Sequence, residues 1–212
     1  MKIALIGASG FIGSAIRTEA LARGHQVLAL VSNPAKLAAE PGLTVQAVDV
    51  FDTQALTAAL AGVDLVISAF SGHKDADVAG YYRRGFDSIL TAVKAADVAR
   101  LLVVGGAASL QLPDGSVLID SPNFPAEYRG SAEGAIYALQ QLKAETALSW
   151  SFLSPAAEIF PGEKTGQFRL GKDQLVMDAA GHSRISNGDY AVAMLDEAEH
   201  AAHLNQRFTL AY

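Results

Sequence analysis

Short apolar runs alternate with longer Ala- and Leu-rich stretches along the 212 residues. Each run has the length of a strand, and few of them alternate with polar residues. This pattern is typical of strands that are buried on both faces, as in a parallel sheet. The predicted strands cover residues 3–6, 27–31, 45–48, 65–69, 101–104, 150–153 and 206–211. The stretches between them predict helices at 13–23, 53–61, 81–96, 132–145 and 189–199. The alternation predicts an α/β fold with a doubly wound parallel sheet, in one domain spanning residues 1–212.

Two segments break the alternation. Residues 107–131 hold three prolines and two glycines, which predicts a long loop. Residues 156–188 mix turn residues with short apolar runs, which predicts turns and short strands. We expect both segments to form a small irregular cap on the sheet. Loops this long in a compact domain usually have a function.

Composition excludes several classes of function. The formal charge of -6 argues against nucleic acid as a partner. The chain has no cysteine, so thiolate metal sites and disulfides are excluded. The histidines and acids show no metal-ligand spacing, so no metal site is predicted. The short apolar run at the start breaks at Gly7, so neither a signal peptide nor a membrane span is expected. These features favour a cytoplasmic protein without a membrane partner.

The first predicted strand runs directly into the text GASGFIG and then into a helix. Glycines spaced by three at this point have a physical explanation. Gly7 permits a tight turn, Gly10 lets the backbone approach a pyrophosphate, and Gly13 lets the helix pack close to the sheet. The start of the helix presents free N–H groups to the anion. The predicted pyrophosphate residues are Gly7, Ser9, Gly10, Phe11, Ile12 and Gly13. The alternative is a glycine-rich connection that binds no ligand.

The spacing Gly-x-x-Gly-x-x-Gly resembles the atypical and extended branch of the short-chain dehydrogenase/reductase superfamily. The resemblance becomes narrower with VVGGAASL, FPAEYRG, SFLSPAAEIFPGEKTGQFRLGKDQLV and SRISNGDYAVAMLDE. Together these segments resemble the NmrA-like NAD(P)-binding family, in the group of NADH-flavin reductases and biliverdin reductase B-like proteins. This resemblance covers nearly the whole chain. It implies a Rossmann-like doubly wound sheet with a small irregular C-terminal cap.

The resemblance also implies the rest of a dinucleotide path. In AVDVFD, Asp49 would accept from the adenine amino group and the Val50 amide would address the ring. Alternatively, Asp49 only caps a loop. In VDLVISAFSG, the positions that would line the ribose and nicotinamide are Ala69, Phe70 and Ser71. Gly105 in LLVVGGAASL and Pro155 in FLSPA would lie beside the nicotinamide.

The end of the second predicted strand bears on the choice of cofactor. NAD-preferring sites usually have an acid there, but this chain has Val31 or Ser32. NADP-preferring relatives usually have an arginine there, which Ser32 replaces. Ser32 and Asn33 could still bind a 2′-phosphate, and Lys36 lies one turn further on, where it could equally be a solvated surface lysine. We expect NADP(H) to be preferred and NAD(H) to be tolerated.

Most short-chain dehydrogenases use a Tyr-x-x-x-Lys pair to exchange a proton with a carbonyl. No tyrosine here has a lysine four residues later, and Tyr137-x-x-x-Gln141 comes nearest. This absence argues against a nucleotide-sugar epimerase or dehydratase. Reduction of a flavin does not need the pair, because hydride passes from the nicotinamide C4 to the flavin N5 and solvent supplies the proton. We therefore expect a flavin or quinone-like small-molecule acceptor. A redox sensor that binds the dinucleotide without turnover fits the same residues.

The acceptor side is less defined than the dinucleotide path. Catalytic residues stay unknown, with Ser109, Tyr128 and His73 as weak candidates. A histidine such as His73, in a loop after a strand, is more commonly a surface residue than a proton donor. Aromatic or small residues at the carboxyl ends of the strands could line the acceptor or simply pack in the core. They are Phe70, Ser109, Phe124, Tyr128, Pro155 and Phe160. The pattern fits a monomer or a homodimer.

Overall fold

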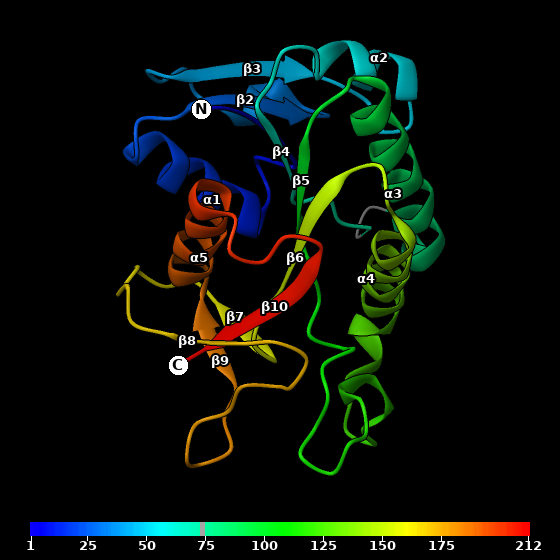
Figure 1. Cartoon of the computed structure of the whole chain (residues 1–212), viewed down its shortest axis with the longest axis vertical. Helices are drawn as coiled ribbons and strands as arrows, with labels where there is room; N and C mark the ends of the chain where they lie inside the picture. The colour runs from blue at the N-terminus through cyan, green and yellow to red at the C-terminus, as the bar shows by residue number, and fades with distance from the viewer. Residues whose placement is uncertain (73–74) are drawn as a thin grey trace.

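The computed structural model describes residues 1–72 and 75–212. An eight-stranded sheet forms its centre, in the order β3-β2-β1-β4-β5-β6-β10-β8 (Figure 1). Neighbouring strands pair in parallel, except that β8 runs antiparallel to β10. The strands of the sheet are β1 Lys2–Ile6, β2 Gln26–Val31, β3 Leu43–Ala47, β4 Leu65–Ser68, β5 Arg100–Val104, β6 Ser149–Ser154, β8 Arg169–Gly171 and β10 Gln206–Ala211. A separate parallel pair joins β7 Glu158–Phe160 to β9 Arg184–Ser186.

Helices cover both faces of the sheet, so the predicted α/β fold with a parallel sheet is confirmed (Figure 1). One face carries α1 Phe11–Ala22 and α5 Asn187–His200. The other carries α2 Thr53–Ala59, α3 Val78–Ala95 and α4 Ala126–Ala144. Adjacent residues of one strand point to opposite faces of the sheet and pack in different hydrophobic cores. Leu101 packs in the core under α3 and α4, and Leu102 packs in the core under α1 and α5. This double burial explains why the strands read as continuous apolar runs.

The strand order reverses at β1. Its neighbours are β2 on one side and β4 on the other, and the chain reaches β4 only after β2 and β3. In open α/β sheets such a reversal opens a crevice at the carboxyl ends of the strands, where ligands bind. The residues after β1 are the glycine turn. The topology therefore puts this turn at the switch point of the sheet.

The first cap segment differs from its prediction. The loop ends earlier than residue 131, because α4 begins at Ala126 and not at residue 132. Pro125 takes the N-cap position, where its φ of -64° suits the start of a helix. Gly130 lies inside α4, and a Cβ there would be 3.0 Å from the Val78 Cβ of α3. Proline and glycine are both typical of loops, but here Pro125 precedes the first turn of the helix and Gly130 allows close helix packing. The remaining loop contains a short 3₁₀ helix at Leu118–Asp120.

The second cap segment is ordered around a buried carboxylate. Asp189, which is fully buried, accepts hydrogen bonds from the backbone N–H groups of Thr165 and Gly166 at 2.8 and 2.7 Å. It also accepts from the Tyr212 hydroxyl at 2.7 Å, while its own N–H donates to Ser186 Oγ at 2.9 Å. Burial alone would raise the pKa of Asp189. The hydrogen bonds from Tyr212, Gly166 and Thr165 outweigh that and hold the pKa below its usual value.

We expect Asp189→Asn to lower the free energy of unfolding by about 1–3 kcal/mol at neutral pH, because an amide cannot accept all these bonds. The folded-state pKa is depressed, so this contribution is present above the unfolded-state pKa and is lost as the pH falls through the folded-state value. Urea unfolding of parent and variant at neutral pH and below about pH 4 would measure both effects. Glu127→Gln, an exposed change on α4, serves as the control. Equal stabilities at neutral pH would contradict this role.

Candidate functional site

The first glycine turn has no room for side chains at two of its three glycines. Gly7 has a φ of 80°, and a Cβ there would lie 2.5 Å from the Ala69 carbonyl oxygen. At Gly13 a Cβ would lie 2.1 Å from the Gly7 carbonyl oxygen. Backbone packing therefore requires both glycines. At Gly10 the nearest atom would be the Gly7 oxygen at 3.4 Å, which is an ordinary contact. Packing therefore does not require a glycine at position 10, and the missing side chain leaves the exposed turn open beside the start of α1.

The turn leads into the amino end of α1. Gly10 is its N-cap and has no side chain to cap the helix, and the first helical bond runs from Ser14 N–H to Gly10 O at 2.8 Å. The N–H groups of residues 11–13 precede that bond, and the first turn holds no acid. Ser9 and Phe11 are exposed beside them. Free amides and the helix dipole make this a suitable place for a phosphate group.

Hydrogen bonds join the turn to the strands on either side of β1. Gly7 N–H donates to Leu30 O in β2 at 3.0 Å, and Ala69 N–H donates to Ile6 O in β1 at 2.9 Å. The predicted adenosine residues follow β2 and the predicted nicotinamide residues follow β4. The structure therefore brings both groups to the two sides of the glycine turn.

Beyond β2, Ser32, Asn33 and Lys36 are all exposed. Asn33 Oδ1 accepts from Ala35 N–H at 3.1 Å and caps the short 3₁₀ helix Pro34–Lys36. The amide NH₂ of Asn33 is the part of its side chain that could donate to a phosphate. Lys36 ends this helix. The three residues thus form one polar segment beside the turn.

The two interpretations of Asp49 are compatible in the structure. Its Oδ1 accepts from Phe51 N–H at 3.0 Å, so it does cap a loop, and it is also exposed. Val50 O accepts from Ser88 Oγ of α3 at 2.6 Å, and Ser88 Oγ is 2.7 Å from Thr53 Oγ1. Ser88 fixes the carbonyl group of Val50, the residue whose own N–H is predicted to address a base. No local sequence pattern points to Ser88, because its partner lies 38 positions away.

Phe70 is primarily a packing residue. Its ring stacks on Tyr81 with centroids 5.8 Å apart, and it also contacts Phe51 at 6.4 Å and Tyr82 at 5.7 Å. A Cβ at Gly85 of α3 would lie 2.4 Å from this ring. The ring is directed against α3. Phe70 therefore faces the turn with its backbone and not with its ring. Its neighbours Ala69 and Ser71 are half-buried and exposed, respectively.

Gly105 and Pro155 lie at the ends of β5 and β6. Gly105 N–H donates to Leu153 O at 2.9 Å, and a Cβ at Gly105 would lie 2.2 Å from the Phe152 ring. Pro155 is buried. The Tyr190 hydroxyl of α5 donates to the same Leu153 carbonyl at 2.6 Å. These contacts fix the strand ends closely and explain Gly105 by packing.

The weak catalytic candidates differ in their surroundings. Ser109 is half-buried, and both its O and its Oγ accept from Arg207 Nη1, at 3.0 and 2.9 Å. Arg207 also pairs with Asp173 of the second cap segment. Tyr128 is 57% exposed in the first turn of α4. His73 lies outside the described residues. Ser109 thus tethers the cap, while Tyr128 is accessible.

Two aromatic candidates for the acceptor side are covered by arginines. The Arg129 guanidinium lies 5.8 Å from the ring centre of Phe124, and that of Arg184 lies 4.8 Å from Phe160. Both contacts are typical of cation–π packing. Neither ring is brought to the glycine turn by any contact of the described residues.

Tyr137 is occupied elsewhere. Its hydroxyl donates to Asp87 Oδ1 of α3 at 2.9 Å, and the Arg83 guanidinium lies 5.5 Å from its ring centre. Burial and the Asp87 carboxylate raise the pKa of this hydroxyl. A raised pKa makes the phenol a weaker acid and keeps it from ionising to the phenolate that would act as a base. Tyr137 in the Tyr-x-x-x-Gln pattern is thus bonded to α3 and poorly suited to exchange a proton.

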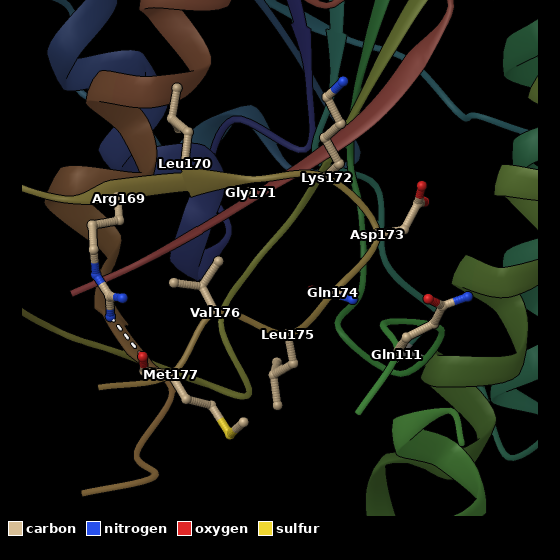
Figure 2. Close-up of a pocket in the computed structure, with 10 residues that line it drawn as sticks. All are labelled: Gln111, Arg169, Leu170, Gly171, Lys172, Asp173, Gln174, Leu175, Val176 and Met177. Atoms are coloured by element: carbon tan, nitrogen blue, oxygen red, sulfur yellow. Dashed lines mark hydrogen bonds between the residues drawn. The ribbon is translucent and has the colours of Figure 1, made fainter. Parts of the chain in front are cut away.

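One cavity lies in the cap, away from the glycine turn. It measures about 560 Å³ and is formed by the segment 169–177 with Gln111. Figure 2 shows that Leu170 and Lys172 point to one side of this segment and Leu175 and Met177 to the other. Arg169 donates to Met177 O at 2.8 Å. Side chains that diverge in this way do not form a binding site. Across residues 1–72 and 75–212, no three His, Asp or Glu side chains gather as a metal site.

A family model described as NAD(P)H-binding matches residues 7–198, from the first glycine of the turn to the end of α5. The chain belongs to this NAD(P)H-binding family. The match agrees with the open face at Gly10 and the uncapped start of α1. The resemblance to atypical, NmrA-like short-chain dehydrogenases/reductases is thereby confirmed.

Relatives of this NAD(P)H-binding chain cover its whole length. The uncharacterized protein YwnB of Bacillus subtilis is 41% identical over 99% of this chain and 98% of its own. A Bacteroides thetaiotaomicron structure named as a candidate epimerase is 41% identical, covers 100% of this chain and 96% of that one, and gives a TM-score of 0.93. A Streptococcus pneumoniae structure named as a candidate NADH-flavin reductase is 35% identical, covers 100% and 99%, and gives 0.88. In the part of the chain that the structure describes, no helix is long and apolar enough to cross a bilayer.

Gly10→Val should leave the fold intact and abolish dinucleotide binding. Its side chain has space in the turn but projects where a pyrophosphate would lie, so we expect NADPH affinity to fall by more than about tenfold. Titration followed by nicotinamide fluorescence, with thermal unfolding beside it, would test this. Gly13→Val is the matched control, because its side chain meets backbone and should destabilise the fold itself. A Gly10→Val protein that binds NADPH like the parent would show that the phosphates lie elsewhere.

Proposed function

We propose that the protein is an NAD(P)H-dependent oxidoreductase that reduces a flavin or quinone-like acceptor. The observation that carries the proposal is the open face of the turn at Gly10. Gly7 and Gly13 are explained by packing, whereas the missing side chain at Gly10, beside the uncapped start of α1, would let a pyrophosphate approach the backbone. A bound dinucleotide would supply hydride from its nicotinamide C4. The chain would hold its phosphates at the turn and orient its two ends.

The lack of a proton-donating pair supports a flavin or quinone-like acceptor. The tyrosine nearest to the pattern, Tyr137, is engaged by Asp87. A flavin or a quinone can take its proton from solvent, whereas a nucleotide-sugar epimerase or dehydratase needs a protein base. Positioning the acceptor against the nicotinamide is then the main contribution of the protein.

NADP(H) is the proposed preference, with NAD(H) tolerated. Val31 and Ser32 offer no carboxylate to bind the two ribose hydroxyls of NAD(H) or to repel a 2′-phosphate. Lys36 and the Asn33 amide group are available donors beside Ser32. Asp49 and Val50 would address the adenine.

A redox-sensing binding protein without significant turnover is the second candidate. It is favoured by the acceptor side, where Ser109 is bound by Arg207 and the rings of Phe124 and Phe160 are covered. Of the candidates there, Tyr128 keeps an exposed polar group. A dinucleotide sensor needs only the turn.

We further propose a cytoplasmic protein that acts on a small molecule as a monomer or homodimer, without nucleic acid or membrane as partner. The net charge of -6 argues against nucleic acid.

The deciding experiment is a titration with NADPH and with NADH, followed by NADPH oxidation with FMN, riboflavin or menadione. We expect tighter binding of NADPH and a rate above the enzyme-free blank with at least one acceptor. Binding with blank rates for all three acceptors would favour the sensor. Binding of neither dinucleotide would overturn both candidates, and turnover of a nucleotide sugar would reinstate the epimerase.

Ser32→Arg should strengthen NADPH binding relative to NADH by about 1–2 kcal/mol, because it adds a charge-assisted hydrogen bond to the 2′-phosphate. Comparing the two dissociation constants for parent and variant at one ionic strength would measure this. Ser32→Gln, which adds a shorter polar side chain without charge, is the control. An unchanged ratio would mean that the end of β2 does not face the 2′-phosphate.

A further inference from the structure

Arg17 reaches from α1 back to the glycine turn. Its Nη1 donates to the Ala8 carbonyl oxygen at 3.1 Å, and its side chain is 18% exposed. Ala8 is fully buried and follows Gly7, whose N–H is bonded to Leu30 O near the end of β2. The guanidinium therefore lies at the level of the turn, on the side where β2 ends.

The second partner of Arg17 is a loosely held carboxylate. Glu40 Oε1 lies 3.4 Å from Arg17 Nε, and the Glu40 side chain is 44% exposed. Nε itself is buried and makes no hydrogen bond within the described residues. An ion pair in which one oxygen faces one nitrogen without hydrogen-bond geometry uses little of the guanidinium fork. Glu40 thus balances the charge of Arg17, but the buried Nε–H of Arg17 still lacks a hydrogen-bond acceptor among the described residues.

Glu40 belongs to the same connection as the predicted phosphate segment. This connection runs from Ser32 at the end of β2, through Lys36, to Leu43 at the start of β3. Arg17 touches the turn on one side and this connection on the other. If a dinucleotide bound with its pyrophosphate at the turn, its adenosine ribose would lie between the turn and this connection.

We propose that Arg17 is the cation that recognises the 2′-phosphate of NADP(H), and that Glu40 occupies its place when that phosphate is absent. This inference rests on the proposed function and adds a specificity residue to the same site. A phosphate matches the planar fork of arginine better than a single carboxylate oxygen does. A dianionic 2′-phosphate would also repel Glu40, which is exposed and can turn to solvent. Discrimination against NAD(H) then comes from a cation on α1, because the residue at the end of β2, Ser32, carries no charge.

A structural role for Arg17 makes a different prediction. If the guanidinium only fixes the Ala8 carbonyl, its removal loosens the turn and weakens NADPH and NADH equally. If it binds the 2′-phosphate, NADPH alone is affected. The ratio of the two dissociation constants therefore separates the two roles, because a distorted turn does not change it.

The test measures binding of NADPH and NADH to the full chain for Arg17→Gln, Glu40→Gln and the exposed control Thr18→Ala. We expect Arg17→Gln to raise the NADPH dissociation constant about tenfold and that of NADH less than about twofold. Glu40→Gln should lower the NADPH constant about threefold and leave NADH unchanged, since it removes an exposed competing charge. Thr18→Ala should change neither.

Each result bears on the inference separately from the proposed function. An unchanged NADPH/NADH ratio in either variant overturns the role of Arg17 and leaves the proposed function standing. Glu40→Gln keeps the test valid if Arg17→Gln does not fold, because Glu40 is on the surface. Failure of the parent to bind either dinucleotide would overturn both proposals at once.

Discussion

The close approach of three backbone segments at the first glycine turn determines the geometry of the site. Gly7 touches the Ala69 carbonyl after β4, and Gly13 at the start of α1 touches the Gly7 carbonyl. A side chain at either glycine would push α1 away from the sheet or β4 away from β1. Since neither contact tolerates a Cβ, the amino end of α1 is fixed over the carboxyl ends of β1, β2 and β4. The open face at Gly10 is therefore presented by a rigid support.

The two irregular segments are bound to each other as well as to the sheet. Gln111 N–H donates to Asp173 O at 2.8 Å, and Leu175 N–H donates to Gln111 O at 2.9 Å. Arg207 of β10 connects Ser109 to Asp173, which joins the same two segments through side chains. These contacts hold the cap together on this side. Its order comes from contacts between residues far apart in the chain, which no local pattern encodes.

The sequence predicted the sheet because double burial leaves a local signature, the continuous apolar run. It misjudged residues 126–131, because proline and glycine signal a loop and a helix boundary equally well. It missed Ser88 and Arg17, whose roles depend on Val50 and Ala8 and become visible only once the helices are packed. It left Phe70 open between lining a ligand and packing, and in the structure its ring packs against α3. The backbone geometry of the turn was thus predictable, and side-chain direction was not.

The glycine turn and the acceptor side of the candidate site differ in how closely their contacts define them. At the turn, backbone contacts fix the amino end of α1 in one position. At the ends of β5 and β6, Gly105 lies against Phe152 and Ser109 is bound by Arg207. Tyr128, in the first turn of α4, is exposed. Specificity requires convergent polar groups whose loss is costly, and the described candidates on the acceptor side do not converge in this way. If the protein is an enzyme, such an acceptor side favours planar electron acceptors that need orientation more than specific recognition. Flavins and quinones are acceptors of this kind.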